Sequence, residues 1–116
     1  MVRTAEAAPA AMRPRAFELY AKGAGESVEF AVERFKRSLA EEIGRIRSSR
    51  ETGDREALAA AAHRLRTLGS LAEARRLSDL ANRLQDRTAA LSPSALEALV
   101  GEIIEEAGRL EQSLRP

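Results

Sequence analysis

The sequence contains a single histidine, His63, and no cysteine among its 116 residues. Histidine is the residue type that ordinarily titrates near neutral pH, and a neutral imidazole is a competent nucleophile. The lack of cysteine excludes disulfides, thiolate metal sites, cysteine nucleophiles and iron–sulfur clusters. A zinc site would have to use mostly carboxylate ligands, so we expect no metal and no cofactor in this chain.

Small and basic residues surround His63 in the sequence. Small side chains lie within one or two helical turns of the histidine: Ala59, Ala60, Thr67 and Ser70. They would let the backbone of another protein come close to the imidazole. Arg64 and Arg66 flank the histidine and could hold an anion such as phosphate. Alanine runs also simply favour helix, and an exposed histidine is usually only solvated, so spacing alone leaves both interpretations open.

His63 is expected to face solvent from the middle of a helix. Successive residues of a helix are about 100° apart, which places His63 near 140° when Leu58 is taken as zero. The other apolar residues of this segment fall within roughly 80° on one side of Leu58. These residues are Ala61, Leu65, Leu68 and Ala72. The imidazole should therefore lie nearly opposite the apolar stripe, which we expect to be core.

The helix that carries His63 is one of four long helices that the apolar spacing predicts. Ser27 is a plausible N-cap for a helix ending near Ser49, and Asp54 can cap the histidine helix. A further helix is carried by Leu77, Leu80, Ala81 and Leu84, and the last begins at Ser92-Pro93 and extends to Leu114. No apolar residues alternate with period two, so we expect no strand.

These helices predict an all-α fold, an antiparallel up-down four-helix bundle. A short helix from Pro14 to about Lys22, with Phe17 and Tyr20 facing inward, should lie across one end. It should break at Gly23 and Gly25. We expect residues 1–13 to be a flexible tail and residues 14–116 to form a single domain.

Composition excludes several classes of function. The 19 basic and 18 acidic residues nearly cancel, aromatic residues make up 3%, and tryptophan is absent, so we expect no nucleic-acid partner. No window approaches 18 consecutive apolar residues, so we expect no membrane span. The alanine-rich start lacks the compact apolar stretch of a secretory signal, and we expect a cytoplasmic location.

The stretch from Ala62 to Ser70, continuing through Ala74 to Leu80, resembles a histidine-containing phosphotransfer (Hpt) domain. The signature of that family is an alanine–histidine pair, then leucine two, lysine three and glycine four positions on, with an alanine and two leucines in the next helix. The matching residues are Ala62, His63, Leu65, Ala74, Leu77 and Leu80. Phe35 in the preceding helix and Gly53-Asp54 before the histidine helix also agree with the family.

Two positions depart from the family pattern within a resemblance that covers about Phe17 to Leu114. The lysine of the family is Arg66 here, which keeps a cation beside the histidine but with a wider, planar head. The glycine of the family, which leaves room for a partner, is Thr67 here. A threonine at that position could narrow the choice of partner, slow transfer, or mark a domain that only binds.

The resemblance implies a phosphorelay intermediate. His63 would take a phosphoryl group from a receiver-domain aspartate and pass it to another receiver, with Arg66 as charge partner. The docking surface would comprise Ala59, Ala60, Arg64, Thr67 and Ser70. The divalent metal would belong to the receiver of a response regulator or hybrid histidine kinase. No G-x-x-x-x-G-K motif is present, so we expect no autonomous ATP-dependent kinase activity.

Two other functions remain open at this stage. The first is a degenerate, binding-only helical adaptor that docks a receiver or kinase; the retained histidine argues against it, and the loss of the glycine at Thr67 argues for it. The second is a dimerising hairpin like that of a kinase dimerisation domain. That function needs an apolar seam left over after the bundle closes, and the sequence offers no spare stripe, so we expect a monomer.

Overall fold

Side-chain caps fix the start of three of the four long helices. In the computed structural model, which describes residues 18–19, 21–23 and 25–114, the helices are α3 (Val28–Thr52), α4 (Arg55–Leu71), α5 (Arg75–Arg87) and α6 (Pro93–Ser113). Ser27, Asp54 and Ser92 each accept a hydrogen bond from the backbone N–H three residues later. The three caps expected from the sequence are therefore confirmed.

Glycine ends α3 and no side chain caps α5. Gly53 has φ +73 and its N–H donates to the carbonyls of Arg50 and Ser49, so α3 runs three residues beyond the expected end near Ser49. The chain turns between α4 and α5 at Glu73, whose φ is +56. The N–H of Ala74 then donates to the carbonyl of Gly69 at 2.7 Å, which directs α5 back along α4.

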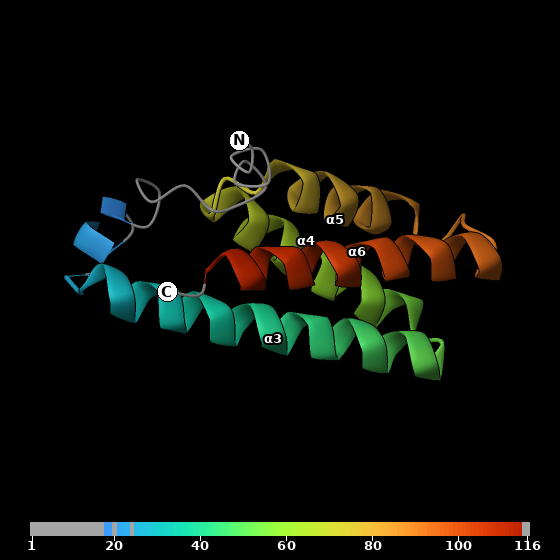
Figure 1. Cartoon of the computed structure of the whole chain (residues 1–116). Coiled ribbons are helices and arrows are strands. Elements are labelled where there is room, and N and C mark those ends of the chain that lie inside the picture. Colours follow the sequence, from blue (N-terminus) through green and yellow to red (C-terminus); the bar gives the residue numbers. More distant parts are fainter. Residues whose placement is uncertain (1–17, 20, 24, 115–116) are drawn as a thin grey trace.

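The four helices form a bundle in which successive helices run in opposite directions (Figure 1). α4 packs against both α3 and α5, and α6 packs against both α5 and α3, which closes the bundle. The described part of the chain is helical with no strand. The all-α helical bundle expected from the sequence is confirmed.

The core is built from leucine, isoleucine, valine, alanine and Phe35 on the inner faces of the helices. On α4 the fully buried residues include Leu58, Ala61, Ala62 and Leu65. Leu68, which the sequence predicts to be core, is only partly buried. The buried face of α4 is centred on Leu65 and includes Gly69, so Leu68 is left at its edge.

Two contacts hold α4 closely against α5. A Cβ added to Gly69 would lie 2.9 Å from the backbone nitrogen of Ser78, so the two helices approach at a distance that only glycine allows. At the other end of α4, the guanidinium of Arg55 donates to the carbonyls of Thr88 and, at 2.9 Å, of Leu91. The helix that carries His63 is thus fixed to its neighbour near both ends.

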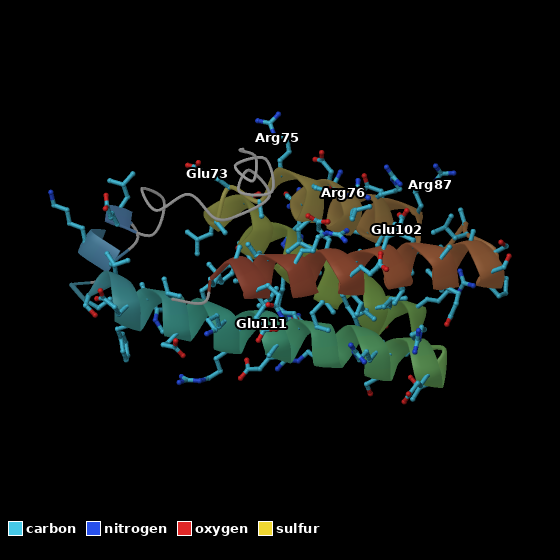
Figure 2. The ribbon with its side chains drawn as sticks, viewed as in Figure 1. Glu73, Arg75, Arg76, Arg87, Glu102 and Glu111 are labelled. Carbon is cyan, nitrogen blue, oxygen red and sulfur yellow. The ribbon has the colours of Figure 1, made fainter. Side chains whose placement is uncertain are left out.

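Two buried glutamates tie the helices together in pairs. Glu42 of α3 accepts from Arg64 of α4 at 3.0 Å and from Arg45 of its own helix at 2.8 Å. Glu106 of α6 lies 3.4 Å from Arg76 of α5 and accepts from Arg109 at 2.9 Å. Figure 2 shows the other charged side chains along the outside of the helices.

The segment before α3 is described only in part. Residues 18–19 and 21–23 are helical and lie at the end of the bundle where α3 begins (Figure 1). Ala21 is buried, and Gly25 has φ +73 in the turn that follows. Residues 1–17 and Tyr20 lie outside the described residues, and with them the expected tail and the inward placement of Phe17 and Tyr20.

None of the helices described is long and apolar enough to cross a membrane.

Candidate functional site

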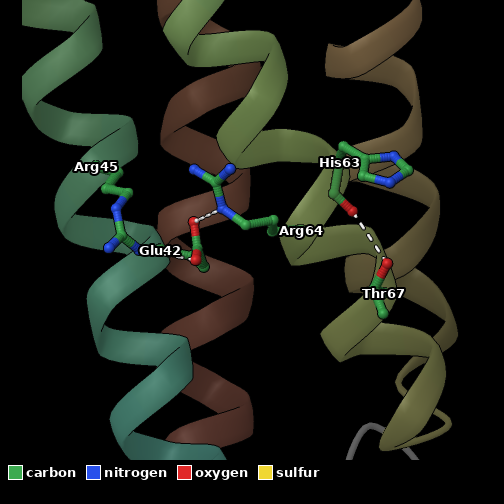
Figure 3. Close-up of polar contacts among 5 residues, drawn as sticks. All are labelled: Glu42, Arg45, His63, Arg64 and Thr67. Atoms are coloured by element: carbon green, nitrogen blue, oxygen red, sulfur yellow. Dashed lines mark hydrogen bonds and ion pairs between the residues drawn. The ribbon is translucent and has the colours of Figure 1, made fainter.

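His63 projects from the middle of α4 on the side opposite the core (Figure 3). Its side chain is exposed, whereas Leu58 and Leu65 on the other side of the same helix are almost completely buried. The predicted exposure of His63 is confirmed. An imidazole in this position is accessible to a group presented by another protein.

Arg66 lies beside the imidazole. Its Nη2 is 3.5 Å from Nδ1 of His63, and its side chain is half-buried. Residues three apart on a helix are neighbours on its surface, so α4 itself brings the two groups together. The structure therefore places a permanent positive charge next to the nucleophile expected from the sequence.

Thr67 lies one turn after His63 and bonds to its own helix. Its Oγ1 donates to the backbone carbonyl of His63 at 3.3 Å (Figure 3). Threonine commonly makes this bond to the carbonyl four residues earlier. The hydroxyl is thus occupied, and the exposed threonine adds volume beside the imidazole that a glycine would not.

Ser70 and Ser78 connect the histidine face of α4 to α5. The two hydroxyls are 3.1 Å apart, and Ser78 Oγ also donates to the carbonyl of Arg66 at 3.4 Å. Ser70 is exposed, two turns after His63 on the same face of α4. The serines thus join α4 to α5 on the side of α4 that carries His63.

Arg64 does not join His63. Its Nε donates to Glu42 of α3, and Figure 3 shows the arginine and the imidazole projecting to different sides of α4. The residue that follows His63 is rotated by about 100°, which takes it to the α3 side of the helix. Arg64 was expected beside the histidine as a possible anion contact, and the structure instead assigns it to the α3–α4 ion pair.

Ala59 and Ala60, two of the small residues expected to dock a partner, differ in their exposure. Ala60 is exposed and lines a shallow hollow between α3 and α4 together with Arg45, Ser48 and Arg64. Ala59 is half-buried. Both side chains are small, and their contact with a partner stays a prediction.

The family model for the Hpt domain matches residues 31–114, which is more than half of the chain. The chain belongs to the Hpt domain family. No curated protein and no solved structure is significantly similar to it. Hpt domains take part in two-component phosphorelays, where they interact with receiver domains of response regulators or kinases. The helical bundle and the exposed His63 on α4 agree with that membership.

Gln85 of α5 is a residue with a buried polar atom that the sequence analysis did not single out. Ser70 and Ser78 are in contact across two antiparallel helices, and His63 lies seven residues before Ser70 while Gln85 lies seven after Ser78. Seven residues are about two turns, so His63 and Gln85 occupy equivalent facing positions. The register between α4 and α5, which no local pattern reveals, places them at the same level of the two helices.

The Oε1 atom of Gln85 is buried and has no hydrogen-bond partner in the described part of the chain. A buried acceptor without a partner is costly and is usually satisfied by another group or by water.

The site of this Hpt domain contains no acidic cluster. Among the residues described, no group of three or more histidine, cysteine, aspartate or glutamate side chains could hold a metal ion. The charged group shown beside the imidazole is the Arg66 guanidinium, a cation that suits an anion such as a phosphoryl group.

Proposed function

We propose that this Hpt domain shuttles a phosphoryl group between receiver-domain aspartates through His63. The observation that carries the proposal is the arrangement on α4: an exposed imidazole in mid-helix with the Arg66 guanidinium 3.5 Å from Nδ1. Phosphoryl transfer needs positioning and charge neutralisation more than elaborate covalent chemistry. Two side chains on one rigid helix can supply the nucleophile and the cation.

The reaction balances without a cofactor in this chain. A lone pair on a neutral imidazole nitrogen attacks the phosphorus of an aspartyl phosphate, and the bond from phosphorus to the aspartate oxygen breaks. The electron pair leaves with the carboxylate, and the phosphoryl group stays on the imidazole. The positive guanidinium of Arg66 neutralises part of the negative charge of the phosphoryl group. A receiver with its own divalent metal would supply the remaining neutralisation, so we propose that this domain carries none.

A binding-only adaptor is the second candidate, and Thr67 is the observation that favours it. The threonine is exposed one turn from His63, on the side from which a receiver would approach the imidazole. An added side chain at that point could allow docking but hold the reacting atoms too far apart for transfer. Retention of the histidine and the adjacent arginine is the reason that we rank transfer first.

Incubation with a panel of receiver domains labelled on their aspartates separates the two candidates. Transfer predicts acid-labile, base-stable label on this chain and none on the His63→Gln variant. If the wild type and the His63→Gln variant both bind a receiver and neither acquires label, the adaptor is established instead. Label on the variant would show that another residue is the acceptor.

We further propose that the domain acts as a cytoplasmic monomer. The whole candidate site lies on α4 and α5 of one chain, so a second copy would add nothing to it. Sedimentation at several protein concentrations tests this: a single species of 12.6 kDa supports it, and a concentration-dependent dimer contradicts it.

A further inference from the structure

The shallow hollow between α3 and α4 is basic and open to the outside. Its volume is about 250 Å³, and its lining residues are Arg45, Ser48, Ser49, Ala57, Ala60 and Arg64. No carboxylate is among these residues, and the two alanines are too small to obstruct the entrance. The hollow is therefore a depression in which the charged groups are two arginines.

One buried carboxylate holds the two arginines of the hollow in place. Glu42 Oε1 accepts from Arg64 Nε at 3.0 Å, and Glu42 Oε2 accepts from Arg45 Nη1 at 2.8 Å (Figure 3). Because each oxygen of one carboxylate holds one guanidinium, the arginine of α3 and the arginine of α4 are kept close together. A single negative charge balances only one of the two positive charges, so the hollow keeps a net positive charge.

Most hydrogen-bond donors of these two arginines are unused. A guanidinium has five N–H donors, and in the described part of the chain Arg64 uses only its Nε and Arg45 only its Nη1. The side chains of Arg45 and Arg64 are 53% and 48% exposed, so their remaining N–H groups can be reached from outside. Two guanidiniums with fixed positions and free donors suit a carboxylate, which accepts paired, charge-assisted hydrogen bonds.

The hollow is separate from the imidazole but close enough for one partner to cover both. Arg64 and His63 project to different sides of α4, so an anion in the hollow is not the group carried by the imidazole (Figure 3). Ala60, which lines the hollow, comes three residues before His63, or about 4.5 Å along the helix axis. A stable interface buries about 800 Å² of each partner. A protein seated on His63 is therefore large enough to cover the hollow as well.

We propose that the hollow between α3 and α4 receives an aspartate or glutamate side chain of the receiver that docks on His63, and that Arg45 and Arg64 thereby select among receivers. This inference rests on the proposed function, since it takes the partner to be a receiver domain. A receiver with a carboxylate at this point gains charge-assisted hydrogen bonds to both guanidiniums. A receiver with lysine or arginine there brings a cation against two others, which disfavours the wrong partner.

Calorimetric titration of Arg45→Gln with receivers that bind the wild type tests the role of this arginine. Glu42 keeps its bond to Arg64 in the variant, so the ion pair between α3 and α4 is retained. We expect the affinity to fall about threefold to fivefold, the size of effect of one partly exposed ion pair. Arg47→Gln is the matched control: it removes the same charge from α3, but Arg47 lines a different groove, between α3 and α6. Equal losses of affinity in the two variants would overturn the proposal.

Ser48→Glu supplies the hollow with a carboxylate of its own. Residues three apart on a helix are neighbours, so the new side chain can reach the Arg45 guanidinium and take the place of the partner's carboxylate. Receiver affinity should fall about tenfold, because attraction is replaced by repulsion. Ser48→Gln has the same size without the charge and should bind more tightly than Ser48→Glu. Equal affinities of these two variants, with denaturant melts showing both to be folded, would refute the charge-based selection.

A double-mutant cycle identifies the acidic side chain of the receiver. In a receiver that binds, exposed aspartates and glutamates are changed one at a time to the corresponding amide. One such change should weaken binding to the wild type about threefold to fivefold and have almost no effect on binding to Arg45→Gln. If no acidic residue of the receiver is coupled to Arg45 in this way, the hollow does not receive a carboxylate of the partner.

The free domain offers a test that needs no receiver. The Nε–H signals of Arg45 and Arg64 are followed by NMR while sodium acetate replaces sodium chloride at constant ionic strength. We expect saturable shifts of both signals in the wild type and none in Ser48→Glu. The same response to acetate and chloride would overturn the proposal. Absence of binding by every receiver would instead count against the proposed function, and the acetate titration would still decide whether the hollow takes a carboxylate.

Discussion

At the scale of single residues, His63 is the one side chain in the sequence that can carry a phosphoramidate on an imidazole. We predict that His63→Gln abolishes acid-labile labelling by phosphorylated receivers. The change should alter the free energy of unfolding by no more than about 0.5 kcal/mol, because the residue is exposed and caps no helix. Labelling assays and urea melts on the same preparations check both parts; a variant that fails to fold would contradict the surface position.

Thr67 is expected to limit how closely a receiver can approach His63. We predict that Thr67→Gly speeds transfer or widens the set of receivers accepted, because it removes the side chain one turn from His63. The same change should destabilise α4 by about 0.5–1 kcal/mol, since glycine is a poor helix former. Transfer rates with several receivers and a denaturant melt of each variant test whether transfer becomes faster while the free energy of unfolding falls.

Thr67→Ser separates the hydroxyl from the volume of the side chain. Serine keeps the oxygen that donates to the His63 carbonyl and loses the methyl group. If the volume matters, the serine variant should lie between the wild type and glycine in rate. A folded Thr67→Gly variant that transfers more slowly than the wild type would mean that the threonine assists the reaction.

At the scale of helices, Gly69 sets the distance between α4 and α5. We predict that Gly69→Ala destabilises the protein by about 1–3 kcal/mol, because the new Cβ would lie 2.9 Å from the nitrogen and 3.1 Å from the Cα of Ser78. Gly101→Ala in α6 is the matched control: its Cβ meets nothing within 4 Å, so it should gain up to about 1 kcal/mol from helix propensity. Equal effects in urea melts would contradict the close approach.

The two faces of α4 should respond differently to substitution. We predict that Leu65→Ala costs about 2–5 kcal/mol, because Leu65 is fully buried and its truncation leaves a cavity. Ala60→Trp should leave stability nearly unchanged and weaken receiver binding, because Ala60 is exposed beside the histidine face. Calorimetric binding and thermal melts check this, and tight binding by a folded Ala60→Trp would move the docking surface elsewhere.

Local signals predicted the helices well. The caps at Ser27, Asp54 and Ser92 are short-range hydrogen bonds that the sequence displays directly, and the apolar spacing on α4 was enough to place His63 at the surface. The start of α5 carried no such signal, since Ala74 provides no side-chain cap.

Relations between helices were not predictable in the same way. The pairing of Arg64 with Glu42, the contact of Ser70 with Ser78, and the partial exposure of Leu68 all depend on the register and distance of neighbouring helices. The role of Gly69, whose lack of a side chain sets that distance, is likewise not visible in the spacing of its own helix. The surface position of His63 and the nearness of Arg66 were therefore predicted, and the contacts between helices were not.

At the scale of the whole molecule, buried Glu42 and Glu106 join α3 to α4 and α6 to α5. We predict that Glu42→Gln and Glu106→Gln each destabilise the protein by about 1–3 kcal/mol, because charge-assisted hydrogen bonds to arginine are lost. The two effects should add in the double variant, since the two carboxylates share no partner. Denaturant melts measure the free energy of unfolding of each variant. A loss in the double variant that differs clearly from the sum of the two single losses would reveal coupling between the two ion pairs.

The contacts of Gly69 and Arg55 that hold α4 against α5 bear on the direction in which a relay would run. A backbone held near both ends presents one and the same surface to a receiver that gives up its phosphoryl group and to one that takes it. Such a carrier has no built-in direction. Net flow would follow the abundance and phosphorylation potential of the receivers alone, so a cell that accumulates one unphosphorylated receiver would drain the phosphoryl groups from the other through this domain.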